Sequence, residues 1–95
     1  MSLDEFKGTL AGNRAPEVSG PLLALWHDAR GDWEAAHGLV QSDGSSHGAW
    51  VHAYLHRKEG DLGNASYWYR RAGRRTADGE LATEWDEMAA VLLGP

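Results

Sequence analysis

The stretches LWHDARGDW (residues 25–33) and YLHRKEGDL (residues 54–62) align with an offset of 29 residues and decide the fold. Each contains a Gly-Asp pair after a run of helix-forming residues. Glycine readily takes the left-handed conformation that ends a helix, and the aspartate that follows is a good N-cap for the next one. Two helices joined by so short a turn run antiparallel. The sequence therefore predicts two copies of a helical hairpin.

Helical signals continue on both sides of these turns. The hairpins are expected at residues 21–41 and 47–73, separated by a Ser/Asp/Gly linker. A capping box formed by Ser2 and Glu5 begins a short helix over 3–10, and apolar spacing predicts a last helix over 80–93. No segment alternates with period two. We predict an all-α fold in a single domain, 1–95.

The second hairpin resembles the tetratricopeptide and Sel1-like repeat families. Its residues Gly60-Asp61, Ala65, Tyr69 and Ala72 stand at the spacing of the turn glycine, close-packing alanine, aromatic residue and second alanine of those repeats. The segment ASYWYRRA (65–72) is similar to the Ala-x-x-Trp-Tyr-x-Lys-Ala segment of Sel1-like repeats. Residues Gly31-Asp32, Trp33 and Ala36 form a weaker first copy, so the resemblance covers about residues 20–73.

The resemblance implies a tetratricopeptide-like stack of two repeats with a C-terminal capping helix, which would act as a binding scaffold. It carries over no catalytic residues. Three features depart from the family pattern. The offset is shorter than the ~34 residues of a tetratricopeptide repeat, no proline closes either unit, and two units are fewer than the ~3 that a stable solenoid needs.

Composition excludes several classes of protein. Hydrophobic residues make up 42% of the chain and charged residues 24%, which is typical of a folded domain. The absence of cysteine excludes disulfides, thiol nucleophiles and cysteine-ligated metals. The net charge of −5 argues against a nucleic-acid partner. No apolar run is long enough for a membrane span and no signal peptide is evident, so we expect no membrane partner and a cytoplasmic location.

Two groups of residues are candidates for binding a protein or peptide partner, or a second copy of the chain. The first helices of the hairpins would line a groove with Trp50, Tyr54 and Arg57. Three consecutive aromatic residues in one helix cannot all face the core, so a second surface is expected at Tyr67, Trp68, Arg70 and Arg71. The alternative is that these aromatic side chains simply pack beneath neighbouring helices.

Five histidines give a further possibility. His52 and His56 are four residues apart and share one helix face, where they could bind a divalent metal. His27 aligns with His56 in the repeat and could join them, with a carboxylate from Glu34, Glu84, Asp86 or Glu87. Otherwise these imidazoles are hydrogen-bonded core residues.

No catalytic motif is evident. We therefore expect a small non-enzymatic protein–protein interaction module without a cofactor. The alternative is a helical protein that binds a metal or a small molecule through its histidines.

Overall fold

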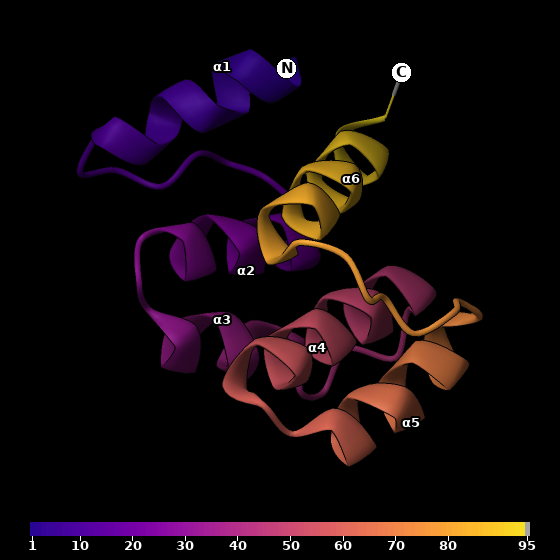
Figure 1. The fold of residues 1–95 in the computed structure, drawn as a ribbon. Coiled ribbons are helices and arrows are strands. Elements are labelled where there is room, and N and C mark those ends of the chain that lie inside the picture. Colours follow the sequence, from indigo (N-terminus) through magenta and orange to yellow (C-terminus); the bar gives the residue numbers. More distant parts are fainter. Residues whose placement is uncertain (95) are drawn as a thin grey trace.

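The computed structural model describes residues 1–94, which form helices and no strands (Figure 1). The helices are α1 (Leu3–Gly8), the 3-10 turn η1 (Thr9–Ala11), α2 (Gly20–Ala29), α3 (Trp33–Val40), α4 (Ser46–Glu59), α5 (Leu62–Ala72) and α6 (Leu81–Leu93). The predicted all-α fold is confirmed. Within these residues, no helix is both long enough and apolar enough to cross a membrane.

The two Gly-Asp turns have the same geometry. Gly31 and Gly60 have φ values of 83° and 92°. The carboxylates of Asp32 and Asp61 accept hydrogen bonds from the backbone N–H three residues later, at 3.1 and 3.2 Å. Each aspartate N–H also donates to a histidine carbonyl at 2.9 Å, closing the end of the preceding helix. Helices α2 and α3, and α4 and α5, pack as pairs around these turns.

A Gly31→Ala substitution should lower the free energy of unfolding by about 1–2 kcal/mol, because a Cβ is disfavoured at positive φ. Nothing lies within 4 Å of the added Cβ, so backbone strain alone is responsible. Gly38→Ala is the matched control within the same hairpin. Gly38 lies inside α3 in equally open space, and alanine there should stabilise the fold by about 0.5–1 kcal/mol. Urea unfolding should show these opposite signs, and equal signs would contradict the role of the turn.

Helix α4 is the centre of the molecule and contacts α2, α3, α5 and α6. Nine consecutive residues of α4, from Gly48 to His56, are buried. Helix α6 packs across α2 and α4, the first helices of the two hairpins, and also meets α1 (Figure 1). Its Trp85 donates a hydrogen bond to the Leu25 carbonyl at 3.0 Å and stacks on Phe6. Helix α6 therefore covers the face on which the repeat resemblance implied a groove.

Candidate metal centre

Three histidines meet where α3 packs against α4. His52 and His56 lie on one face of α4 and are buried, and His37 reaches them from α3. Ala36 and Val40 of α3 are fully buried in the core, and α3, which carries His37, packs against α4. One ring nitrogen from each histidine lies within 4.8 Å of the other two, and the Nε2 atoms of His37 and His52 are 3.1 Å apart. We call His37, His52 and His56 the histidine cluster.

Two tryptophans fix the rings of the cluster. Trp33 stacks on His37 with ring centroids 4.8 Å apart, and Trp68 stacks on His52 at 4.0 Å. The indole N–H of Trp33 donates to the Leu55 carbonyl at 2.9 Å, which anchors that tryptophan to α4. Aromatic stacking on two sides limits rotation of the imidazoles, so the cluster is preorganised.

The hydrogen bonds of the cluster leave nitrogen lone pairs available. The Glu59 carboxylate lies 2.6 Å from His56 Nδ1, and a proton on that nitrogen leaves Nε2 as a free acceptor or ligand. His37 and His52 share one proton between their Nε2 atoms, because two N–H groups cannot face each other. His52 Nδ1 is buried and has no hydrogen-bond partner among the described residues.

Burial keeps two of the three imidazoles neutral. Together with smaller effects of the nearby His56 and His37, it lowers the pKa of His52 from 6.5 to about 4. Burial also lowers the pKa of His37, with His56 as the second cause and Glu59 and Glu34 opposing it. Neutral imidazole is the form that binds metal ions. Near pH 7 these rings carry no excess proton, and the one proton between the Nε2 atoms of His37 and His52 has only to move to a ring Nδ1 for both Nε2 atoms to bind an ion.

The structure brings together His52 and His56, as their spacing predicted, but it does not add His27. That residue lies at the end of α2, in edge-to-face contact with Trp26. Although α2 also packs against α4, His27 lies in its last turn against Trp26 and contributes no ligand atom to the cluster. The third histidine is instead His37, from the helix that packs directly on α4.

The carboxylate near the cluster also differs from those suggested by the sequence. Glu84 accepts hydrogen bonds from Trp50, Arg57 and Tyr69, and Asp86 forms an ion pair with Lys7. Glu34 and Glu87 are exposed. Glu59, one turn after His56 on α4, is the acid that contacts a cluster histidine.

Trp50, Tyr54 and Arg57, which were expected to line a partner groove, do not lie together on an open surface. Trp50 and Tyr54 are only 5% and 3% exposed and line two separate pockets. Arg57 forms an ion pair with Glu84 at 2.9 Å and also donates to the Gly79 carbonyl. The physical reason is α6, which supplies Glu84 and covers this face of α4.

The aromatic run in α5 divides between surface and interior. Tyr67 is 44% exposed, and the Arg71 guanidinium lies over the rings of both Tyr67 and Trp68. Arg71 also donates to the Tyr67 hydroxyl at 3.2 Å, and Arg70 is exposed beside it. Trp68 turns inward onto His52, so it belongs to the wall of the histidine cluster.

A second group, His56 with Glu59 and Asp61, also has ligand atoms within 4.8 Å of one another. It shares His56 with the histidine cluster, and its two acids are exposed at the end of α4, where water competes for them.

Searches against models of protein families, curated proteins and solved structures found no match to this chain. The three-histidine geometry is thus the basis for assigning a function.

Proposed function

We propose that this protein binds a divalent transition-metal ion through His37, His52 and His56. The observation that carries the proposal is the convergence of three ring nitrogens within 4.8 Å, two of them 3.1 Å apart. A tetrahedral zinc ion with Zn–N bonds of 2.0–2.1 Å requires nitrogens roughly 3.3 Å apart. The His37–His52 pair already matches this separation, and the His56 nitrogen lies within 4.8 Å of both.

The surroundings of the cluster support this assignment. Glu59 on His56 Nδ1 is the kind of outer carboxylate that orients metal-binding imidazoles and makes them better ligands. The Trp33 and Trp68 rings stack on two of the three ligands, which reduces the entropy lost on binding.

Three imidazoles favour zinc, cobalt, nickel or copper over magnesium and calcium, which prefer oxygen ligands. Three protein ligands also leave a fourth position of a tetrahedral ion for water or another small ligand. The proposed function is accordingly binding of a soft or borderline divalent ion.

Calorimetric titration of chelator-treated protein with Zn²⁺ at pH 7.5 tests the proposal. We expect one ion per chain, and each of His37→Ala, His52→Ala and His56→Ala should weaken binding by roughly tenfold or more, because each removes a ligand. His27→Ala and His47→Ala are the matched controls and should bind as the native chain does. Far-UV circular dichroism identifies any variant that has lost its helices.

The proposal fails if no zinc binds to folded protein, or if the controls weaken binding as much as the cluster variants do. Since the three cluster histidines come from two helices, a result in which His37→Ala alone has no effect would also contradict the three-ligand site.

The interaction module implied by the repeat resemblance is a second candidate, favoured by the outer face of α5. There, the exposed Tyr67 lies among Arg70 and Arg71. An aromatic side chain with arginines suits an acidic peptide. Two results together would favour this candidate over the metal site. The native chain would bind such a peptide while the variant Arg70→Glu/Arg71→Glu does not, and the native chain would take up no zinc.

A further inference from the structure

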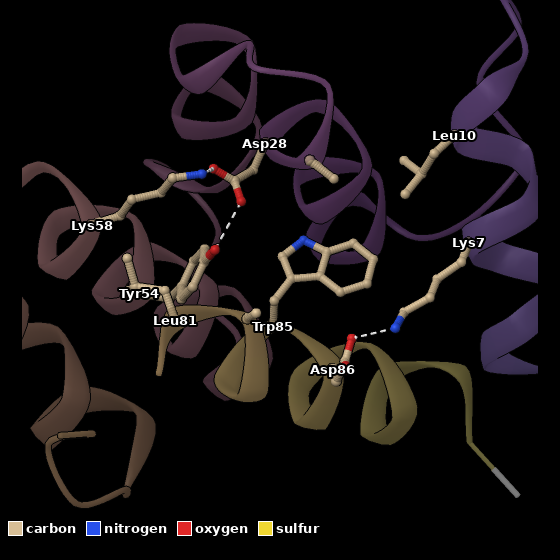
Figure 2. Close-up of a pocket in the computed structure, with 10 residues that line it drawn as sticks. Lys7, Leu10, Asp28, Tyr54, Lys58, Leu81, Trp85 and Asp86 are labelled. Carbon is tan, nitrogen blue, oxygen red and sulfur yellow. Dashed lines mark hydrogen bonds and ion pairs between the residues drawn. The ribbon is translucent and has the colours of Figure 1, made fainter. Parts of the chain in front are cut away.

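A pocket of about 360 Å³ opens between α1, α2, α4 and α6 (Figure 2). Tyr54 and Lys58 of α4 line it. At 100° per residue, these two side chains leave α4 on the side opposite to His52 and His56. The pocket is therefore separate from the histidine cluster. Its volume is at the small end of the range for pockets that bind organic molecules.

The body of the pocket is apolar. Its lining includes Leu10 of η1, Ala29 of α2, and Leu81, Ala82 and Trp85 of α6. Trp85 lies between the two polar ends of the pocket, with Leu10 facing it from the N-terminal segment (Figure 2). The Trp85 indole N–H already donates to the Leu25 carbonyl, so its ring offers an apolar surface. A bound molecule would place a hydrocarbon or aromatic body here.

Two ion pairs close the ends of the pocket. At one end, the Asp28 side chain is only 2% exposed and accepts from Lys58 Nζ at 2.9 Å and from the Tyr54 hydroxyl at 3.0 Å. At the other end, Lys7 Nζ lies 2.9 Å from Asp86 Oδ1, and both side chains are partly exposed (Figure 2). Lys7 and Lys58 are the only lysines in the sequence, and both line this pocket.

Among the described residues, the two ion pairs leave four lysine N–H groups unused but only one carboxylate oxygen, Asp86 Oδ2. Each oxygen of the buried Asp28 carboxylate already has a partner. Each lysine ammonium carries three N–H groups and uses one of them in these ion pairs. A ligand that enters the pocket and displaces water must therefore supply acceptors to the ammonium groups.

We propose that this pocket binds a small apolar molecule that carries a single carboxylate. Its hydrocarbon or aromatic body lies against Trp85, Leu81 and Leu10, and its carboxylate accepts hydrogen bonds from the lysine ammonium groups. A carboxylate bound to an ammonium forms the stronger, charge-assisted type of hydrogen bond. An amine of the same shape finds only Asp86 Oδ2, at the exposed end of the pocket, because both oxygens of the buried Asp28 already accept from Lys58 and Tyr54.

Three probes of one skeleton test this inference: 4-phenylbutyrate, 4-phenylbutanol and 4-phenylbutylamine. Each is titrated into chelator-treated, isotopically labelled protein, with amide chemical shifts followed at Leu10, Ala29 and Ala82 of the pocket lining. We expect saturable shifts with the acid and at least tenfold weaker binding of the alcohol and the amine. Equal binding of all three probes, tighter binding of the amine, or no shifts at all would overturn the proposal.

Substitutions then locate the carboxylate. Lys58→Met and Lys7→Met each remove one ammonium and should reduce the preference for the acid over the alcohol. Lys7 belongs to a partly exposed ion pair, so Lys7→Met keeps the test valid if Lys58→Met fails to fold. Arg14→Met, at an exposed position between η1 and α2, is the matched control and should leave the preference unchanged. An unchanged preference in both lysine variants would overturn the assignment.

Discussion

Replacing Glu84 with alanine should lower the free energy of unfolding by about 3–5 kcal/mol, because it leaves a largely buried arginine without its partner. The Glu84 carboxylate is 5% exposed and accepts hydrogen bonds from Arg57 at 2.9 Å, the Tyr69 hydroxyl at 2.6 Å and the Trp50 indole at 3.3 Å. Alanine removes all three acceptor contacts at once. Urea unfolding at pH 7, followed by tryptophan fluorescence, measures the loss.

Two variants separate this effect from a general sensitivity of α6. Glu87→Ala changes an exposed acid on the same helix and should alter stability by about 0.5 kcal/mol or less. The double variant Glu84→Met/Arg57→Met removes both charges and should be more stable than Glu84→Ala alone, since an apolar pair leaves no buried charge. A loss below about 1 kcal/mol in Glu84→Ala, or a double variant that is less stable still, would contradict the explanation.

Glu84 also explains why α6 lies where it does. Its partners come from α4 and α5, so one carboxylate joins the C-terminal helix to the second hairpin. Sequence analysis could predict α6 as a helix but not this position. Nothing local distinguishes Glu84 from Glu87, and glutamate is rarely buried unless it is paired. Its partners lie 15 to 34 residues away along the chain.

The parts of the fold that could be predicted are those set by short-range chemistry. Gly31 and Gly60 with their following aspartates determine the hairpin turns through conformations available within two or three residues. The capping box of Ser2 and Glu5 likewise forms as expected, with both hydrogen bonds present. These features depend on neighbours in sequence, and sequence patterns report them directly.

The candidate site was only partly predictable for the same reason. The four-residue spacing of His52 and His56 places them together on any helix. His37 stands on the apolar stripe of α3 with Trp33, Ala36 and Val40, which was a usable signal that it faces a neighbouring helix. The alignment of the two hairpins pointed to His27 instead. Such an alignment pairs residues at the same position in each hairpin, whereas a metal site needs residues whose side chains face one another.

The metal-free protein should lose stability as the pH falls from 6.5 toward 4. His52 has a pKa of about 4 in the folded chain, against 6.5 when it is exposed in the unfolded chain. The unfolded state therefore binds more protons between these values, and its free energy falls relative to the folded state. The contribution of neutral His52 to the free energy of unfolding is fully present above pH 6.5. It is smaller by about 2 kcal/mol at pH 5 and is lost near pH 4.

His37 acts in the same direction, because its pKa is also lowered by burial and by His56. The stability curve comes from urea unfolding at several pH values between 7.5 and 5 with a chelator present. His52→Phe, which can keep the stacking on Trp68 but cannot be protonated, should flatten the curve. His47→Gln, at an exposed position of α4, should not. If His52→Phe retains the native slope, protonation of the buried cluster is not what destabilises the fold.

Zinc added at pH 6 should restore stability to the native chain but not to His52→Phe, because the ion and the proton compete for the same imidazoles.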